Sequence, residues 1–339
     1  MEKKLVRSTR TVTYRVSRRT FLKTLGGLAL APYAPYALSA AAQQIQPIRF
    51  GLQNTFTGAA AVVWARKRIY EKRGLKVEAF NFADGRGVHD AMLAGKIDFG
   101  TMNLTPFFVG AATGAFTLIG FVLLGGDTVG VMARPGINTI ADLKGKNVSI
   151  TVGSTTGPVF VYQVGPKLGL KEGDYRIVNL QPANQVPALA AGSIDAFAGP
   201  EPYLTVGEEE KIGKVLVRFG QYDSIPTCLV VSAAFLEKNP DTVIAFLKSW
   251  LDAVEYWQRN PVGVVEALHS MYRESGYTAL TLAMVGKMAK LPKVVPDITP
   301  ELVSDMKVQA EILYKAGSLK RVPEWDKVIR SDMLAKARG

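Results

Sequence analysis

The chain carries one ten-residue pattern twice, AMLAGKIDFG at residues 91–100 and ALAAGSIDAF at residues 188–197. Each copy predicts the end of a short helix, a glycine that ends it, and a strand that begins Ile-Asp. Glycine is favoured there because the chain enters the left-handed backbone region as it leaves a helix. Two copies of one helix-to-strand unit indicate two similar lobes, and the alternative is chance similarity between two common turns.

Strands and helices alternate on both sides of each copy. The predicted strands are apolar runs with short connections, at 48–52, 75–80, 97–101 and 116–124, and then at 129–133, 148–152, 176–180, 194–198 and 215–219. Helical patterns lie between them, including 59–73 and 158–168. This alternation is typical of an α/β fold in which helices cover a parallel sheet. Beyond residue 232 the pattern becomes mostly helical, with helices predicted over 242–258, from Pro261, and over 301–316.

The N-terminus resembles a twin-arginine export signal. Residues 17–23 read SRRTFLK, with the pair at Arg18 and Arg19, and a weakly apolar run and small residues ending at Ala42 follow. Basic, apolar and small-residue regions in this order are typical of a cleaved targeting segment. We therefore expect residues 1–42 to be a signal peptide, cleaved near Ala42 on export by the twin-arginine translocase, and the mature protein to work in the periplasm. The alternative is a cationic amphipathic helix at an ordinary N-terminus.

The net charge of the chain belongs mainly to that leader. The whole sequence has 41 Lys and Arg against 29 Asp and Glu, a formal charge of +12. The leader holds eight of the basic residues and one of the acids, so the rest of the chain has 33 and 28 and a charge of only +5. A nucleic-acid-binding protein would have clustered basic residues, so we expect no nucleic-acid partner.

Cysteine and histidine are too few for a disulfide framework or a metal site. The one cysteine, Cys228, lies in an apolar stretch and is predicted to be a small buried side chain. The two histidines, His89 and His269, are far apart and have no metal-ligand spacing. No Ser-His-Asp arrangement or pair of catalytic carboxylates appears. We expect no bound metal, no cofactor and no enzymatic activity.

Four phrases in a fixed order together resemble one known family. They are residues 91–100, IADLKGK at 140–146, residues 188–196 and EPY at 201–203. The chain is similar here to the periplasmic solute-binding proteins that serve ABC importers of nitrate, sulfonates and taurine, over roughly residues 47–330. The resemblance implies a type II-like periplasmic binding protein, with two α/β lobes, two crossing hinge strands and a helical C-terminal part.

The resemblance also implies a division of the chain and a role. Lobe 1 is expected to be discontinuous, formed by residues 46–128 and 230–339, and lobe 2 to be formed by residues 129–229. Such a receptor, expected to be a monomer, binds a small anionic or zwitterionic solute between its lobes and delivers it to an ABC permease in the cytoplasmic membrane. The alternatives are a ligand sensor for a signalling receptor, and an enzyme similar to the thiamine-pyrimidine synthases, whose cysteine-rich iron motif this chain lacks.

Ligands of open α/β sheets lie beyond the carboxyl ends of the strands. In this chain those ends carry hydroxyls, amides and glycines, which suit a small polar solute. The predicted ligand-binding residues are Gln53, Asn54, Thr55, Phe56, Asp84, Thr101, Asn103, Ser154, Thr155, Thr156, Gly157, Glu201 and Tyr203. Arg86 and Asp127 are secondary candidates.

The segment GSTTG at residues 153–157 is the most specific of these. It joins a predicted strand to a helix with Pro158 in its first turn, so free backbone amides and neighbouring hydroxyls would form a cradle for an anion. The alternative is ordinary capping of that helix, which uses the same atoms. Residues 53–57 would supply a second set of donors. No Gly-Lys-Ser/Thr follows the glycine-rich turn, which argues against a nucleotide phosphate loop.

Glu201 is the acid that most restricts the choice of ligand. It lies between Pro200 and Pro202, which present it rigidly. Facing the cleft, its carboxylate would pair with an amine on the ligand, and together with the cradle would suit a zwitterion such as taurine. An aminopyrimidine would also satisfy it, nitrate has no donor for it, and bicarbonate and aromatic acids remain alternatives. The other possibility is that Glu201 makes an internal hydrogen bond that fixes its loop.

Overall fold

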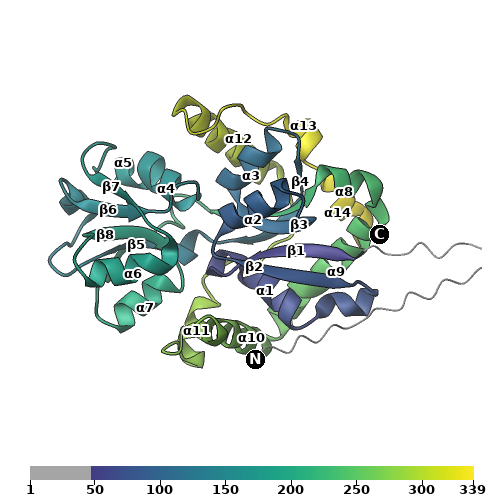
Figure 1. Cartoon of the computed structure of the whole chain (residues 1–339), viewed down its shortest axis with the longest axis horizontal. Helices are drawn as coiled ribbons and strands as arrows, with labels where there is room; N and C mark the ends of the chain where they lie inside the picture. Colours follow the sequence, from purple (N-terminus) through teal and green to yellow (C-terminus); the bar gives the residue numbers. More distant parts are fainter. Residues whose placement is uncertain (1–46) are drawn as a thin grey trace, which may run out of the picture. The chain divides into compact units, whose positions relative to one another are not determined.

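The computed structural model describes residues 47–339. The predicted signal peptide, with Arg18, Arg19 and the cleavage point near Ala42, lies outside the described residues. Residues 47–339 form two five-stranded sheets with helices packed against them (Figure 1). None of the helices in this range combines the length and the apolar character needed to cross a bilayer.

The first sheet contains the first four strands and one that arrives much later in the chain. Its order is β2-β1-β3-β10-β4, and its members are β1 (Ile48–Gln53), β2 (Val77–Phe82), β3 (Phe99–Asn103), β4 (Phe116–Leu124) and β10 (Pro226–Ser232). The helices between these strands are η1 (Phe56–Gly58), α1 (Ala59–Arg66), η2 (Ile69–Arg73), α2 (Gly85–Leu93) and α3 (Leu104–Ala111). The predicted alternation of strands and helices is therefore confirmed.

The second sheet repeats this plan with the order β7-β6-β8-β5-β9. Its strands are β5 (Val129–Ala133), β6 (Asn147–Ile150), β7 (Arg176–Asn179), β8 (Ala196–Pro200) and β9 (Lys214–Arg218). Its helices are η4 (Ile140–Leu143), α4 (Thr156–Val159), η5 (Phe160–Val164), α5 (Gly165–Lys167), α6 (Pro182–Ala190) and α7 (Tyr203–Glu209). Strand for strand, β1, β2 and β3 correspond to β6, β7 and β8, so the two halves share one topology.

The helical C-terminal part is also confirmed. It comprises α8 (Ala233–Lys238), α9 (Pro240–Arg259), α10 (Pro261–Glu274), α11 (Leu282–Met288), α12 (Pro300–Lys315), α13 (Trp325–Val328) and α14 (Ser331–Arg338). These helices pack on the first sheet: Trp250 of α9 is fully buried and its Nε1 donates to the carbonyl of Phe121 in β4 at 3.1 Å. Trp64 of α1 is buried in the same core.

The predicted parallel arrangement does not hold for the pairing of one strand in each sheet. β10 is antiparallel to β3 and β4, and β5 is antiparallel to β8 and β9. Each is the first strand after the chain has crossed from the other sheet: β5 follows β4 of the first sheet, and β10 follows β9 of the second. The neighbouring strands run towards the junction of the two sheets, and a strand that starts at the junction must run away from it.

Two short crossings join the sheets. One contains η3 (Gly126–Thr128), and the other is residues 219–225. They are hydrogen-bonded to each other, because the N–H groups of Gly125 and Gly126 donate to the carbonyls of Ile225 and Ser224 at 3.1 and 2.9 Å. The second crossing ends before β10 begins at Pro226, which is upstream of the predicted lobe boundary at residue 230. The lobe boundaries themselves stay predictions.

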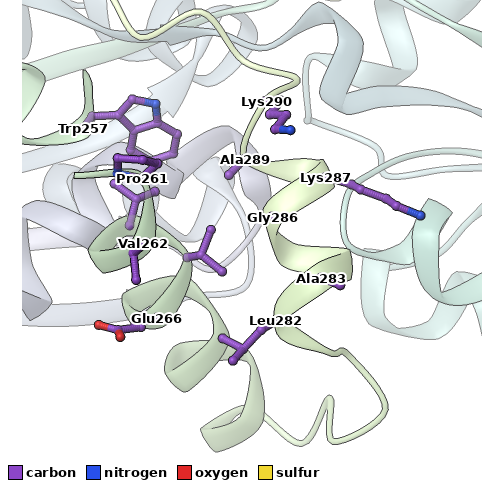
Figure 2. A pocket seen from close by; sticks show the side chains of 12 residues that line it. Trp257, Pro261, Val262, Glu266, Leu282, Ala283, Gly286, Lys287, Ala289 and Lys290 are labelled. Carbon is purple, nitrogen blue, oxygen red and sulfur yellow. The ribbon is translucent and has the colours of Figure 1, made fainter. Parts of the chain in front are cut away.

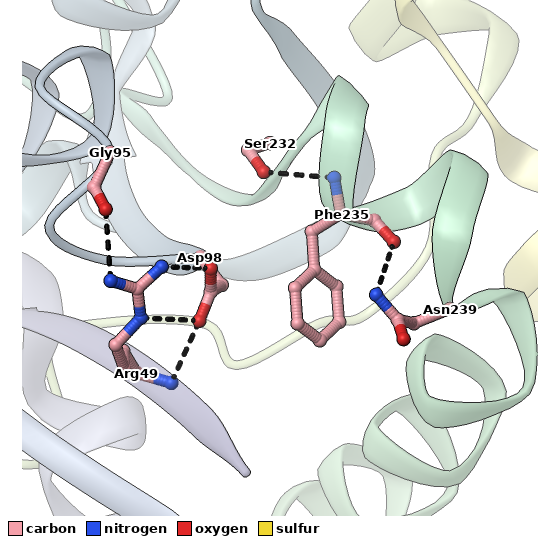
Figure 3. Close-up of polar contacts among 6 residues, drawn as sticks. All are labelled: Arg49, Gly95, Asp98, Ser232, Phe235 and Asn239. Carbon is pink, nitrogen blue, oxygen red and sulfur yellow. Dashed lines mark hydrogen bonds and ion pairs between the residues drawn. The ribbon is translucent and has the colours of Figure 1, made fainter. Parts of the chain in front are cut away.

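The repeated ten-residue pattern has the same structure in both copies. Gly95 and Gly192 follow α2 and α6 with φ of 67° and 71°, in the left-handed region as predicted. Asp98 accepts a hydrogen bond from the Arg49 guanidinium at 2.9 Å and forms an ion pair with it (Figure 3). Its counterpart Asp195 forms an ion pair with Arg134 and accepts the N–H of Asn147 at 2.8 Å. The aspartate of each pattern therefore ties its strand to its neighbours.

Two predicted helices are broken in the structure. The helix predicted over 59–73 divides at Arg68, which has a φ of 50°, and Tyr70 then packs against Trp64 with ring centroids 5.1 Å apart. The helix predicted over 158–168 begins at Thr156 and widens into the π-helical turn η5. Pro166 explains the second change, because it has no N–H to donate to the carbonyl of Tyr162 in an α-helical turn.

Candidate functional site

A small polar cavity lies where the carboxyl ends of strands from both sheets meet. The residues that line it are Gln53, Thr55, Thr57, Asp84, Gly85, Arg86, Asn103, Pro106, Thr151, Ser154, Thr155, Thr156, Pro182, Ala198 and Pro200. Its volume open to the centres of water molecules is about 30 Å³. This position is the one that ligands occupy in open α/β sheets.

Two buried polar atoms of the lining residues have no hydrogen-bond partner within residues 47–339. They are Nε2 of Gln53, which is 1% exposed, and Oδ2 of Asp84, which is 8% exposed. The other oxygen of Asp84 caps α2 by accepting the N–H groups of Arg86 and Gly87 at 3.0 and 3.1 Å. Unpartnered polar groups at such burial are costly, so one donor and one acceptor at this cavity are available to a ligand.

Asp84 and Arg86 are the two charged residues of the cavity; Asp84 is the N-cap of α2, and Arg86 lies in the first turn of that helix. Arg86 reaches across to the second sheet, where its Nη1 donates to the carbonyl of Val152 at 3.3 Å. A Cβ added to Gly153 would lie 3.2 Å from Cδ of Arg86, and Gly153 has a φ of 85°. A glycine at this point therefore allows the close approach of the guanidinium.

The hydroxyls of the GSTTG segment are largely used by the protein itself. Ser154 Oγ donates to the carbonyl of Thr151 at 2.7 Å. Thr155 Oγ1 accepts the N–H of Thr105 at 2.9 Å, so it caps α3, which belongs to the other sheet. Thr156 lines the cavity at the start of α4, whereas Gly157 packs against Ile150 behind it. Thr155 is thus a polar link between the two halves at the rim of the cavity.

Three further polar residues of the lining, Thr55, Thr57 and Asn103, lie at the ends of strands of the first sheet or directly after them. The hydroxyls of Thr55 and Thr57 are hydrogen-bonded to each other at 2.8 Å. Asn103 donates through Nδ2 to the hydroxyl of Thr227 in β10 at 3.0 Å. These bonds fix the side chains on one wall before any solute is bound.

Several predicted residues lie outside the cavity lining, namely Asn54, Phe56, Thr101, Gly157, Glu201 and Tyr203. Phe56 is fully buried and stacks on Tyr272 with ring centroids 6.2 Å apart. The hydroxyl of Tyr203 accepts a hydrogen bond from the hydroxyl of Tyr277 at 3.0 Å, and burial raises the pKa of the Tyr203 phenol. The side-chain oxygens of Asn54 and Thr101 are buried and have no partner within the described residues.

Glu201 is fully buried and both of its carboxylate oxygens are occupied. Oε1 forms an ion pair with Arg218 at 2.8 Å, and Oε2 accepts the N–H of Thr205 in α7 at 2.9 Å. Its carbonyl accepts the N–H of Phe56 at 3.0 Å. This is the internal role that the sequence left open. Within residues 47–339, the carboxylate of the cavity lining that keeps an unpartnered oxygen is Asp84, through Oδ2. Asp127 also lies away from the cavity, where its carbonyl accepts Arg218 Nη1 at 2.7 Å.

Sequence reasoning missed some of the lining. Thr57 belongs to the predicted second set of donors at residues 53–57, whereas Gly85 and Pro200 are adjacent to the predicted residues Asp84 and Glu201 but were not predicted themselves. Pro182 follows β7, whose end was not considered, although it corresponds to the loop that carries Asp84. The correspondence between the two halves was the signal that could have located it. Among residues 47–339, no three His, Cys, Asp or Glu side chains gather as a metal site would require.

A larger but apolar groove lies between α10 and α11 (Figure 2). Its volume is about 480 Å³, and Trp257, Val262 and Leu282 contribute to its walls. In Figure 2 the Lys287 side chain points away from the groove. Because none of the buried polar atoms that lack a partner within residues 47–339 belongs to its lining, the smaller cavity is the better candidate for a polar solute.

A model of the NMT1-like family matches residues 41–265. The chain belongs to the NMT1-like family. This NMT1-like protein is 29% identical, over 67% of its own length and 70% of the other's, to a Bacillus subtilis protein named as an aliphatic sulfonates-binding protein. It is 31% identical to the taurine-binding periplasmic protein of Escherichia coli, over 60% of its own length and 64% of the other's.

The fold of this NMT1-like protein is that of the periplasmic binding proteins. It superimposes with a TM-score of 0.74 on the alkanesulfonate-binding protein of Xanthomonas axonopodis pv. citri bound to MOPS. The match covers 84% of this chain and 97% of the other at 22% identity, which establishes the fold alone. The predicted fold class is confirmed.

Proposed function

We propose that the protein is an extracytoplasmic solute receptor of an ABC importer, which binds a small sulfonate or taurine-like zwitterion in the polar cavity. The observation that carries this proposal is the pair of unpartnered buried atoms, Asp84 Oδ2 and Gln53 Nε2, beside the Arg86 guanidinium. Proteins named for sulfonate and taurine binding are among its relatives, which supports the same solute class.

The charges of the cavity suit the two ends of a zwitterion. The sulfonate would accept hydrogen bonds from Arg86 and from the Gln53 amide, because a guanidinium presents several donors in one plane. The ammonium would donate to Asp84 Oδ2, which takes over the role first expected of Glu201. Nitrate would leave Asp84 unpartnered, because it has no donor.

The size of the cavity requires movement on binding. A space of about 30 Å³ holds on the order of two water molecules, which is less than a solute of several heavy atoms needs. Arg86 and Thr155, which bridge the two sheets at the rim, would have to release their partners for the solute to enter. We therefore expect binding by hinge movement about the two crossings.

The partners and location follow from the same role. A solute receptor of an ABC importer delivers its ligand to a permease in the cytoplasmic membrane. For this protein we propose export by the twin-arginine pathway and work as a monomer in the periplasm. The relatives named as periplasmic binding proteins support this location. Loss of solute uptake on deletion of the gene would distinguish transport from sensing.

Replacing Asp84 with Asn tests the proposed site. Asn keeps the cap of α2, because Asn and Asp are equally good at that position, but it removes the negative charge. We expect Asp84→Asn to raise the dissociation constant for taurine about 10- to 100-fold, as measured by isothermal titration calorimetry. Ethanesulfonate, which has no amine, should bind to the variant as well as or better than to the parent.

Two results would contradict the proposal. Equal losses of affinity for taurine and for ethanesulfonate would mean that Asp84 does not contact the amine. Tight binding of nitrate by the parent, unaffected by the substitution, would exclude a zwitterion as the preferred solute. An unchanged melting temperature of Asp84→Asn without solute is the control for folding.

A further inference from the structure

A buried carboxylate outside the cavity joins the two halves of the molecule. Asp223 lies in the second crossing and is 8% exposed. Its Oδ2 accepts two side-chain amides, Nε2 of Gln163 at 2.9 Å and Nε2 of Gln309 at 2.8 Å. None of the three residues lines the polar cavity.

The two amides come from different halves. Gln163 belongs to η5, beside the second sheet, whereas Gln309 belongs to α12, which packs against α3 of the first sheet. The bond from Gln163 lies within one half, and the bond from Gln309 spans both. Charge-assisted hydrogen bonds of this kind are stronger than those between neutral groups.

The same carboxylate also holds the backbone of the crossing. Its Oδ1 accepts the N–H of Ile225 at 2.7 Å, and Ile225 has a φ of 41°. A β-branched residue in the left-handed region is strained, and the strain persists only when surrounding bonds impose it. The carbonyl of Ile225 accepts the N–H of Gly125 in the other crossing. Asp223 therefore links the conformation of the hinge to the contact between the halves.

We propose that Asp223 and Gln309 are positioning residues that hold the two halves together and so set the affinity of the cavity without touching the solute. A contact present only when the halves are together raises the population of that arrangement. In this proposal the halves keep the contact in the solute-bound arrangement, in which the cavity has widened to hold the solute. The apparent affinity then changes by the same factor for any solute. The part of this inference that concerns affinity rests on the proposed function.

The test compares two leucine substitutions that each remove one amide from the same oxygen. Gln309→Leu removes the bond between the halves, and Gln163→Leu is the matched control that removes the bond within one half. Leucine is a good helix former and close to glutamine in size, so both variants should fold. Spin labels at Lys171→Cys and Lys238→Cys, both exposed and on different halves, report the separation by double electron–electron resonance, since Cys228 is fully buried.

Without any solute, we expect Gln309→Leu to move the label distances towards longer values and Gln163→Leu to leave them close to the parent's. We expect Gln309→Leu to raise the dissociation constants for taurine and for ethanesulfonate by one common factor, about tenfold. The ratio of the two constants then stays unchanged. Gln163→Leu should raise both dissociation constants by much less.

The inference is overturned if Gln309→Leu leaves the distances unchanged, or if the two variants shift them equally. It is also overturned if Gln309→Leu changes the affinity for one solute and not for the other. Failure of both solutes to bind the parent would contradict the proposed function instead. The label distances measured without solute would still decide whether the bond from Gln309 to Asp223 holds the two halves together.

Discussion

Asp84 and Glu201 are two acids near the cavity whose partners give them opposite roles. Glu201 has a cation and a backbone N–H on its two oxygens, so its charge is neutralised inside the protein. Asp84 uses one oxygen as a helix cap, and its other oxygen has no hydrogen-bond partner among the residues that the structure describes. A fully paired carboxylate stabilises structure, whereas a carboxylate with a free oxygen at a cavity is available to a ligand.

Replacing Glu201 with Ala should therefore act on stability. It leaves Arg218, whose side chain is 29% exposed, without its carboxylate, and removes the acceptor for Thr205. Removal of one partner of a buried pair costs about 3 kcal/mol. Urea denaturation should measure that loss, and Glu201→Gln, which keeps the shape of the side chain and one acceptor oxygen, should lose less stability.

The binding of Glu201→Ala separates the two roles. Any loss of affinity in this variant should be equal for taurine and ethanesulfonate, because the Glu201 carboxylate does not contact the amine. A selective loss of taurine would return the amine-binding role to Glu201.

At the scale of elements, the glycines that end α2 and α6 determine where a strand can begin. Both have positive φ, and a Cβ added to either would meet no atom within 4 Å. The cost of a side chain there is therefore purely a cost of backbone conformation. The aspartates three residues later then anchor each strand to its sheet.

Gly192→Ala should lower the free energy of unfolding by about 1 kcal/mol, because the left-handed region disfavours a Cβ. Gly192→Asn should lose less, since asparagine tolerates that region. Gly286 in α11 is the matched control, because it has no positive φ and an added Cβ would make only ordinary contact with Val265 at 3.8 Å. Gly286→Ala should stabilise by roughly 0.5–1 kcal/mol. Equal destabilisation by alanine at both positions, in urea denaturation, would contradict this account.

At the scale of the whole molecule, the contact between the halves contains a titratable group. Burial raises the pKa of the Asp223 carboxyl above its ordinary value, and the nearby carboxylate of Asp305 raises it further. The bonds from Ile225 and Gln163 and the charge of Lys167 oppose this shift. The folded protein therefore keeps a proton at pH values at which the unfolded chain has released it.

This shift predicts a stability that falls as the pH rises. The contribution of Asp223 is fully present below its ordinary pKa and is lost as the pH rises through the raised pKa of the folded state. Asp223→Asn cannot titrate and resembles the protonated acid. We expect the free energy of unfolding of Asp223→Asn, minus that of the parent, to increase as the pH rises from 4 to 7. Urea denaturation at each pH measures this difference. A constant difference across that range would contradict the assignment.

Local patterns in the sequence were sufficient for much of this description. The repeated unit and the left-handed glycines that end its helices were correctly predicted, because the conformation of a helix end depends on residues within a few positions of it. The strands begin at Phe99 and Ala196, two residues after the predicted Ile-Asp starts. The region of the cavity was also predicted in part, since Gln53, Asp84 and Ser154 follow strands whose ends must meet at one edge of a sheet. Whether these residues bind the solute stays a prediction.

Other features depended on residues far apart in the chain. Only the tertiary structure placed Arg218 on Glu201, Thr155 on the first turn of α3, and Gln309 on Asp223. It also decided the reversed directions of β5 and β10. A hydrogen bond requires its partner within about 3 Å. The sequence by itself determined which side chains stand at the strand ends, whereas the packing of the two sheets decided which of them were paired and which were left free for a ligand.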